Sequence, residues 1–425
     1  MLPIINNNNK EIFNFDIKKI FNSRELFINN FDLSNKYIQF IRSFSEKDET
    51  KNLKNISNRE IIIDINYFKK RENINNFSYF AKLCSEEKLL EPIKNNISEI
   101  NFPLISIILP SFNKEKVIMK SIRSIQNQSF KNIEIIIVDD CSTDNSNKYY
   151  QYLLKTDHRI RIFKHLKNMG VWRSRLDGFL YSRGKYVIHF DTGDLYSDRF
   201  VLEDAYNLIE KYNLDSIKML FRLIFSFEDF NNTQIPLVIN SNYTKIVYGS
   251  ENIKKYNEEI FSTWGNIWNR LTRADIVTKG LNLLNKYLIN AYKNIWDDIW
   301  WNKLINEVSN NLLIINRIGY LYYKDGNGEG DIIANSDIKK DKIIHEFIYF
   351  LYFDYKILPN KKNKESIINK LRQYSNYKNN INLKNLISNF FILNNLLNLL
   401  IKDKYISQIN KIFLRKLLRK FKYNN

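Results

Sequence analysis

Short apolar runs alternate with amphipathic segments over residues 104–211, and this alternation constrains the fold more than any other feature of the sequence. The runs at 104–110 and 133–138 are rich in Ile and Val, as strands buried on both faces are. Between them, residues 114–128 space their apolar side chains at three and four, which predicts an amphipathic helix. The same reasoning predicts strands at 160–164 and 185–190, and helices at about 144–155, 172–182 and 199–211. Strands alternating with helices predict an α/β fold with a mostly parallel sheet flanked by helices.

The length of 425 residues allows more than one domain. Residues 1–100 are Asn- and Lys-rich and carry no motif, so we expect a small N-terminal extension there. The alternating pattern places the α/β domain at 101–330. Helical spacing of apolar residues then predicts a helical C-terminal region over 331–425.

The composition excludes several classes of protein. Two cysteines cannot form a disulfide framework, and four histidines without a CxxC motif make no zinc site. The N-terminal residues lack a cationic segment followed by an apolar stretch, so we expect no signal peptide, and no run reaches the roughly 18 apolar residues of a membrane span. We therefore expect a soluble protein of a reducing compartment, the cytoplasm. The net charge of +19 favours an acidic partner, or simply reflects dispersed lysines; without an RNA-binding signature we expect no nucleic acid.

Acidic side chains follow two of the predicted strands. Asp139 and Asp140 come directly after one strand, and Asp191 and Asp194 after another. Because the carboxyl ends of parallel strands meet at one edge of a sheet, these acids are expected at the ligand-binding edge. Carboxylates this close repel each other unless a metal ion, a basic side chain or water lies between them. The alternative for Asp139 and Asp140 is that they are turn and capping residues.

The stretch ISIILPSFNKEKVIMKSIRSIQNQSFKNIEIIIVDDCSTDNS resembles the opening of the family 2 glycosyltransferases, which act on nucleotide-sugars and have the Rossmann-like GT-A fold. It contains their P-T-Y-N-like turn at 110–113, their Q-[ST]-[FY] turn at 128–130 and their V-D-D at 138–140. Next, NMGVWRSRLDGFLYSRGKYVIHFDTGD is similar to the family's N-x-G-x-x-x-A-R-N stretch, a glycine and the metal-binding acids. The resemblance is dense over 104–200 and weaker to about 325.

This resemblance implies a set of nucleotide-binding residues: Pro110, Ser111, Asn113, Glu115, Asp139, Asp140, Asn168, Gly170, Arg175 and Asp191. Asp140 is expected to hydrogen-bond the base or the ribose. Asp191 and Asp194 are expected to bind Mn²⁺ or Mg²⁺, since carboxylate oxygens suit both ions. The motif reads D-T-G-D, so Gly193 stands where the family has a further acid, and one possible ligand is missing.

The catalytic base is expected in the segment NIWDDIWWNKLI, which is similar to the family's E-D pair at the start of a helix. The second acid usually acts as the base, which points to Asp298, with Asp297 orienting the acceptor. The alternative is that both acids simply begin a helix.

Aromatic and basic residues of the same half are expected to contact the sugar, the acceptor or the diphosphate: Trp264, Trp268, Trp296 and Lys324. The alternative for the tryptophans is core packing, which we expect for at least three of the five between Trp264 and Trp301. Lys324 opens a Gly-rich stretch that either closes over the donor or ends the domain.

Taken together, the motifs predict an inverting glycosyltransferase that moves a sugar, most often from a UDP-sugar, to a hydroxyl of a glycan, protein or lipid. Two alternatives are a nucleotide-sugar-binding homologue without turnover and a nucleotidyltransferase. The last segment, YISQINKIFLRKLLRKFKY, places five apolar residues on one side: Ile406, Ile409, Phe413, Leu417 and Phe421. Such a basic amphipathic helix either docks on its own domain or lies on an anionic membrane surface.

Overall fold

The structure is a computed structural model that describes residues 103–224, 245–248, 253, 266–286 and 297–323, and, further on, 351, 355, 364, 367–369, 371, 396–403 and 406–422. These residues fall in two compact units. The first ends at Leu281 and resumes over Asp297–Asp325; the second takes residues 282–296 and everything from Gly326 onward. The boundaries expected at residues 100 and 330 lie outside the described residues.

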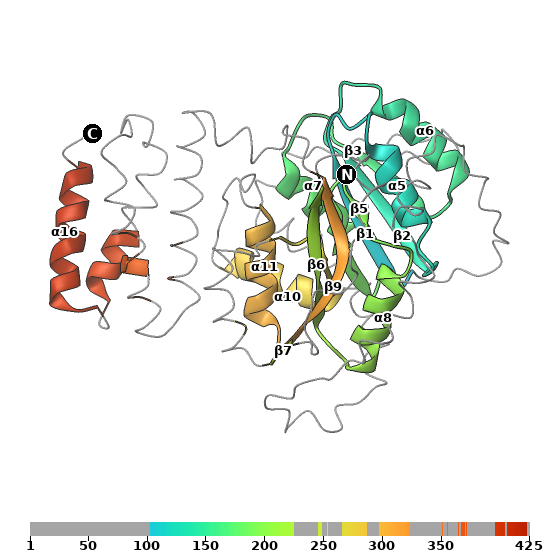
Figure 1. The fold of residues 1–425 in the computed structure, drawn as a ribbon. Coiled ribbons are helices and arrows are strands. Elements are labelled where there is room, and N and C mark those ends of the chain that lie inside the picture. The colour runs from blue at the N-terminus through green and yellow to red at the C-terminus, as the bar shows by residue number, and fades with distance from the viewer. Residues whose placement is uncertain are drawn as a thin grey trace. The chain divides into compact units, whose positions relative to one another are not determined.

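The first unit is built on a nine-stranded sheet with the order β3-β2-β1-β4-β8-β6-β9-β5, in which β7 also pairs with β9 (Figure 1). Its strands are β1 (Ile105–Ser111), β2 (Ile133–Asp139), β3 (Ile160–Lys164), β4 (Tyr186–His189), β5 (Leu195–Tyr196), β6 (Ser216–Ile224), β7 (Lys245–Tyr248), β8 (Arg270–Arg273) and β9 (Asn311–Tyr323). Its helices are α5 (Ile118–Gln126), α6 (Ser146–Thr156), α7 (Val171–Leu180), α8 (Val201–Lys211), α10 (Ala274–Lys286, which runs into the second unit) and α11 (Asp297–Val308).

The α/β prediction is confirmed, and the first four strands are parallel as expected. β1 pairs in parallel with β2 and β4, and β2 with β3. Beyond β4 the sheet is mixed, because β8 runs antiparallel to both β4 and β6, while β6 and β9 are parallel. The predicted strands and helices between residues 104 and 211 all form, with ends shifted by a few residues.

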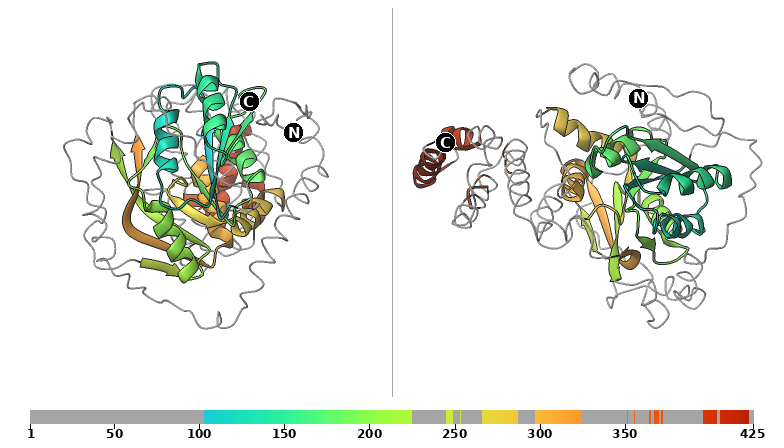
Figure 2. Two further views of the ribbon diagram at one scale, coloured as in Figure 1. Left: turned by 90° about the vertical axis from the view of Figure 1, so that its right-hand side faces the viewer. Right: turned by 90° about the horizontal axis from the view of Figure 1, so that it is seen from above.

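Helices cover both faces of the parallel strands (Figure 2). On one face, Ile107 and Ile135 of neighbouring strands share a core with Ile122 of α5 and Leu153 of α6. The opposite face packs against α7, where a Cβ added to Gly178 would come within 2.4 Å of a β1 side chain. α7 therefore lies directly on the sheet, and its position depends on this glycine.

The strand order places a topological switch point at β1, because the chain continues from β1 to β2 on one side and later crosses to β4 on the other. Ligands of open α/β sheets bind in the crevice at such a point, outside the carboxyl ends of the strands. Those ends are Ser111 of β1, Asp139 of β2, Lys164 of β3 and His189 of β4. The predicted site residues in the loops that follow β1, β2 and β4 thus share one edge of the sheet.

The second unit has its own small apolar core, which includes Leu371, Leu397 and Leu414. Leu414 belongs to α16 (Gln408–Lys422), and Phe413 also packs against this core. Ile409, expected on the same side of the helix as Phe413, is instead 76% exposed. No helix among the described residues is both long and apolar enough to span a bilayer.

Candidate active site

The loops after β1 and β2 are tied together by two predicted nucleotide-binding residues. Asn113 accepts a hydrogen bond on Oδ1 from the backbone N–H of Thr143 at 2.8 Å. Glu115 accepts one on Oε2 from the backbone N–H of Asn145 at 2.9 Å. Both side chains therefore hold the two loops in one arrangement at the carboxyl edge.

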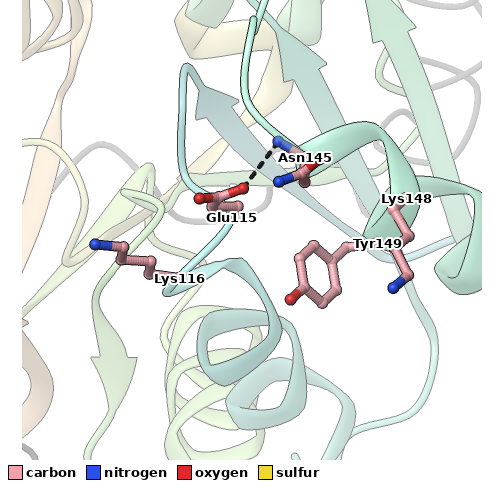
Figure 3. A pocket seen from close by; sticks show the side chains of 5 residues that line it. All are labelled: Glu115, Lys116, Asn145, Lys148 and Tyr149. Atoms are coloured by element: carbon pink, nitrogen blue, oxygen red, sulfur yellow. Dashed lines mark hydrogen bonds between the residues drawn. The ribbon is translucent and has the colours of Figure 1, made fainter.

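A pocket of about 400 Å³ opens beside this junction, lined by Glu115, Lys116, Asn145, Lys148 and Tyr149 (Figure 3). Two lysines and one glutamate give the lining a net positive charge. Of the predicted nucleotide-binding residues, Glu115 is the one that lines it.

Asp139 and Ser111, which end neighbouring strands in register, are both buried. Asp139 accepts a hydrogen bond on Oδ1 from the backbone N–H of Ser142 at 3.1 Å, and its Oδ2 lies 3.4 Å from Nζ of Lys164. Ser111 Oγ accepts a hydrogen bond from the hydroxyl of Tyr150 at 2.9 Å. Burial, and then the charge of Asp139, raise the pKa of Tyr150 to about 12, so this tyrosine stays a donor at neutral pH.

The carboxylate of Asp140 has three hydrogen-bond partners in the protein, and the residue is buried. Its Oδ1 lies 2.6 Å from Nδ1 of His165 and accepts the N–H of Met169 at 2.7 Å, and its Oδ2 accepts the N–H of Gly170 at 2.7 Å. The structure therefore brings together Asp140 and Gly170, both of which were predicted to bind the nucleotide. It also anchors the stretch that contains Asn168 beside β2. His165 was assigned no role from the sequence, because nothing in the local pattern shows that its partners lie 12 and 25 residues away.

Arg175 brings together acids that are far apart in the sequence. Its Nη2 lies 2.6 Å from Oδ1 of Asp191, and its Nε lies 2.5 Å from Oδ2 of Asp297 on α11. Its Nη1 is buried and has no hydrogen-bond partner in the described part of the chain. Burial alone would lower the pKa of Arg175, but Asp191 and Asp297 outweigh it and raise the pKa further, so the guanidinium stays charged.

Asp297 and Asp298 form the first turn of α11, as the sequence predicted. Asp297 is 8% exposed and Asp298 is half-buried. Burial, followed by the neighbouring charge of Asp297, raises the pKa of Asp298 to about 7, against the opposing effect of Arg175. Asp298 therefore changes its charge near neutral pH, which suits a proton acceptor.

The D-T-G-D turn directs its two acids differently. Asp191 keeps 31% of its side chain exposed, whereas Asp194 is 3% exposed and points inward. Asp194 accepts hydrogen bonds from the Tyr320 hydroxyl at 2.7 Å and the Tyr323 N–H at 2.8 Å. Burial and the charge of Asp191 raise the pKa of Asp194 well above its usual range.

Gly193 has a φ of +124°, a conformation that L-residues rarely adopt, although a Cβ there would meet nothing closer than 3.7 Å. An aspartate at this position would be strained by its backbone and not by lack of space. The turn itself therefore accounts for the missing acid of the motif.

Few carboxylates at this edge could serve as ligands of a divalent cation. No group of three or more His, Cys, Asp or Glu side chains in the described ranges is arranged to hold a metal ion. Asp191 fits as a carboxylate that would share a cation with substrate phosphates, the usual way Mg²⁺ is bound. For Asp194 to bind a metal, its hydrogen bonds to Tyr320 and Tyr323 would have to be exchanged.

The predicted sugar-contacting residues divide between the core and the undescribed parts of the chain. Trp268 is 6% exposed and stacks against Tyr320 and Tyr322, with ring centroids 4.3 and 5.4 Å away. Trp300 and Trp301 are fully buried. The expectation that at least three of these tryptophans are core residues is confirmed, and for Trp268 this burial favours the packing alternative over sugar contact. The others lie outside the described residues: Trp264, Trp296 and Lys324.

The topological switch point and the acids around Arg175 define an α/β protein with a candidate ligand site at the carboxyl edge of its sheet. Residues 106–272 match the family model described as glycosyl transferase family 2, which confirms the resemblance over this part of the chain, and the fold is of the GT-A type.

Curated relatives agree with this family. The chain is 32% identical over 155 residues to an uncharacterized glycosyltransferase of Haemophilus influenzae, covering 36% of this chain and 60% of that protein. It is 30% identical over 182 residues to the cholesterol galactosyltransferase of Borreliella burgdorferi, covering 41% and 49%. The chain spans about a third to three fifths of the length of the first such relatives.

Among solved structures, residues 1–349 of TarS from S. aureus, crystallised with UDP, have a similar fold. The TM-score is 0.51 at 14% sequence identity, over 75% of this chain and 88% of that one. At this identity the likeness concerns the fold.

Proposed function

We propose that this protein transfers a sugar from a UDP-sugar to an acceptor hydroxyl with inversion at the anomeric carbon, and that Asp298 is the general base. The observation that carries the proposal is the acid cluster at the carboxyl edge. There, a half-buried Asp298 with a pKa of about 7 adjoins the ion-paired Asp297 and Arg175. The family supports the reaction class, and the UDP bound by the TarS fragment supports the choice of nucleotide.

In the proposed reaction, the Asp298 carboxylate takes the proton of the acceptor hydroxyl as that oxygen attacks the anomeric carbon. The new C–O bond forms on the face opposite the diphosphate, and the old C–O bond breaks, so that UDP leaves with the electron pair. Arg175 holds Asp297 in place through Nε and Asp191 through Nη2. A base that titrates near the working pH is the most efficient in such a step.

Asp191 would hold a Mn²⁺ or Mg²⁺ ion together with the diphosphate. Such an ion, when bound, stabilises the negative charge that develops on the leaving group. We assign the ion to Asp191 and not to Asp194, since Asp191 is the acid of the motif whose side chain is partly exposed. Transfer that survives excess chelator would remove the ion from the proposal and leave Asp191 as the partner of Arg175.

We further propose that the acceptor is a lipid or a lipid-linked molecule at an anionic membrane surface. α16 exposes Ile409 and Ile412 (76% and 51%) beside the exposed cations Arg415, Lys416 and Arg419. Apolar side chains among cations on one helix face suit a surface of acidic lipids. Relatives include a cholesterol galactosyltransferase and a Campylobacter jejuni glucosyltransferase named for an undecaprenol-linked substrate, which is 38% identical over 93 residues.

Vesicle sedimentation tests this surface. The protein should sediment with vesicles containing phosphatidylserine and not with phosphatidylcholine alone, and Ile409→Ser with Ile412→Ser should reduce binding. Equal binding of wild type and double variant would show that this face of α16 is not the contact.

The central test is a thermal-shift screen of UDP-sugars with and without Mn²⁺, followed by measurement of released UDP. Ligand binding to the native state raises its melting temperature. UDP release from one of the sugars, lost in Asp298→Asn, is the expected result. If UDP-sugars bind but no UDP is released with any acceptor, the protein is better described as a nucleotide-sugar-binding homologue without turnover. Pyrophosphate release from a nucleoside triphosphate would favour a nucleotidyltransferase.

A further inference from the structure

His165 lies at the carboxyl edge of the sheet, directly after β3, and its imidazole is fully buried between two carboxylates. Nδ1 lies 2.6 Å from Oδ1 of Asp140, and Nε2 lies 3.1 Å from Oδ2 of Asp177 on α7. The imidazole side chain is 0% exposed, and the two carboxylates are 6% and 3% exposed. A neutral imidazole has one N–H and can donate to one of these acids, whereas a protonated imidazole donates to both.

The same Asp140 carboxylate holds the start of α7. It accepts the backbone N–H groups of Met169 and Gly170, both at 2.7 Å, and Gly170 is the residue before the helix, with a φ of +86°. His165 is therefore linked to α7 in two ways: directly through Asp177, and through Asp140 to Met169 and Gly170, just before the helix. The residue that α7 presents to the acid cluster, Arg175, lies between these two contacts in the sequence.

We propose that His165 is a positioning residue: in its charged form it bridges Asp140 and Asp177, and thereby fixes residues 166–170 and α7 in the arrangement that binds the nucleotide and places Arg175. This inference rests on the proposed nucleotide-binding function of the same edge. It assigns Asp140 an effect on nucleotide binding through the backbone of Met169 and Gly170.

The charges around His165 favour the bridging form. Burial alone would lower its pKa, but the hydrogen bonds and charges of Asp140 and Asp177 outweigh burial and raise it above the ordinary value. From α7, Arg173 also contacts Asp177, at 2.5 Å.

The remaining charges near His165 come from the strands beside it. Asp139 accepts the backbone N–H of His165 on its carbonyl and lies 3.4 Å from Lys164. The pKa of His165 is higher in the folded protein than in the unfolded chain. The bridge to Asp140 and Asp177 is therefore complete at pH values below the ordinary histidine pKa, and it is lost as the pH rises through the pKa that His165 has in the folded protein.

The first experiment follows the histidine itself and needs no nucleotide. The chain has four histidines, so their imidazole NMR signals can be titrated individually, with His165 assigned from His165→Gln. His165 should titrate above pH 6.5, and the amide signals of Met169 and Gly170 should shift with the same midpoint. Asp177→Asn should lower that midpoint. A midpoint at or below 6.5, or amides that do not follow it, would overturn the proposal.

The second experiment compares UDP affinity of wild type and His165→Gln from pH 5.5 to 8.5, with the exposed His158→Gln as the matched control. At low pH, His165→Gln should bind UDP roughly ten- to a hundredfold more weakly, the size of a lost charged hydrogen bond. The ratio of wild-type to variant affinity should shrink toward one as the pH rises. Titration of the UDP phosphate affects both proteins equally and therefore cancels in this ratio. A ratio that stays constant with pH would contradict the proposal.

The two experiments separate the failure of this inference from that of the proposed function. A wild type that binds no nucleotide would count against the proposed function, while the NMR titration still decides whether His165 controls the loop. If His165→Gln does not fold, the His165 signal can be assigned in the wild type from substitution of the other three histidines, and the agreement of its midpoint with the amide midpoints still decides it.

Discussion

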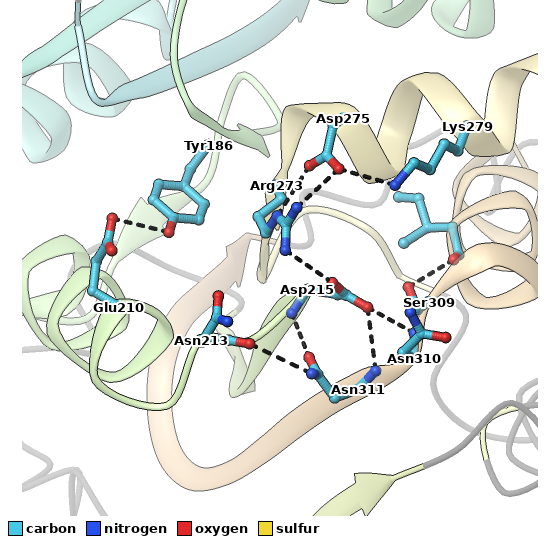
Figure 4. Close-up of polar contacts among 11 residues, drawn as sticks. Tyr186, Glu210, Asn213, Asp215, Arg273, Asp275, Lys279, Ser309, Asn310 and Asn311 are labelled. Atoms are coloured by element: carbon cyan, nitrogen blue, oxygen red, sulfur yellow. Dashed lines mark hydrogen bonds and ion pairs between the residues drawn. The ribbon is translucent and has the colours of Figure 1, made fainter. Parts of the chain in front are cut away.

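Two acid–base networks lie at opposite edges of the same sheet, and they are built differently. At the amino end of β6, Asp215 accepts the N–H groups of Asn310 and Asn311 at 2.7 and 3.3 Å and lies 3.4 Å from Arg273 (Figure 4). Arg273 also pairs with Asp275, which is joined by Lys279. Two acids thus meet two bases, and both oxygens of Asp215 have partners.

The cluster at the carboxyl edge is not balanced in this way. Three acids, Asp191, Asp297 and Asp298, surround one ion-paired arginine, and an N–H group of that arginine has no partner within the described residues. Burial, and then the like charge of Asp297, raise the pKa of Asp298. The balanced network holds strands together, while the unbalanced cluster keeps a carboxylate that exchanges its proton near neutral pH.

Replacing Asp298 by Asn should have the largest effect and should be confined to catalysis. The substitution keeps the size of the side chain and removes its basicity, so sugar transfer should fall by roughly 10²–10⁴-fold with little change in donor affinity. Rates and UDP-sugar affinities of the variant measure this.

Unfolding of the same variant supplies the control. The raised pKa of Asp298 means that its ionised form destabilises the folded state, so Asp298→Asn should be at least as stable as wild type at pH 8. Wild-type transfer by Asp298→Asn, with transfer lost in Asp297→Asn instead, would move the base to the neighbouring residue.

Replacing Asp215 by Ala should lower stability and leave catalysis nearly unchanged, the opposite of the effect expected for Asp298→Asn. Two partly buried backbone donors lose their acceptor and Arg273 loses one of its two carboxylate partners, so the free energy of unfolding should fall by about 1–3 kcal/mol. Activity per folded molecule should remain near wild type, because Asp215 lies at the edge away from the proposed site. Urea unfolding and transfer assays on the same samples measure both quantities. A variant with normal stability but no activity would show that the two networks are not functionally distinct.

The pH dependence of transfer gives a smaller effect. The carboxylate form of Asp298 is lost as the pH falls through about 7, so the rate should drop about tenfold for each pH unit below that value. The rate falls toward low pH because Asp298 can accept a proton only in its ionised form. A rate that is flat between pH 5 and 8 would exclude Asp298 as the base.

The parallel half of this fold could be predicted from the sequence because its signals are local. Runs such as 133–138 are apolar apart from one residue, and the apolar residues of the helices beside them have a clear period. The acids at strand ends could also be located, since chain order decides which loops share an edge. β8 and β9, in contrast, pair with strands far away in sequence, and short apolar runs alone do not specify such partners.

Side-chain partners were harder to predict than positions. The sequence indicated that Asp140, Arg175 and Asp191 lie at one edge, but not that Arg175 would pair with Asp297, 122 residues away. It also predicted that both acids of D-T-G-D bind the metal ion, but not that the turn at Gly193 buries Asp194 and leaves Asp191 partly exposed. His165 had no visible motif, because its two partners come from separate loops.

Replacing Asp191 by Asn should give the smallest change in stability and is the sharpest comparison with Asp215. Asp191 is 31% exposed, and without its charge Arg175 still pairs with Asp297. The free energy of unfolding should therefore change by less than about 1 kcal/mol, as for other partly exposed ion pairs. Because Asp191 contributes to the raised pKa of Asp298, the midpoint of the residual pH–rate profile should move below 7. Urea unfolding and the pH profile of the variant measure the two effects. A loss of 2 kcal/mol or more, with an unchanged midpoint, would mean that Asp191 is a structural brace of the same kind as Asp215.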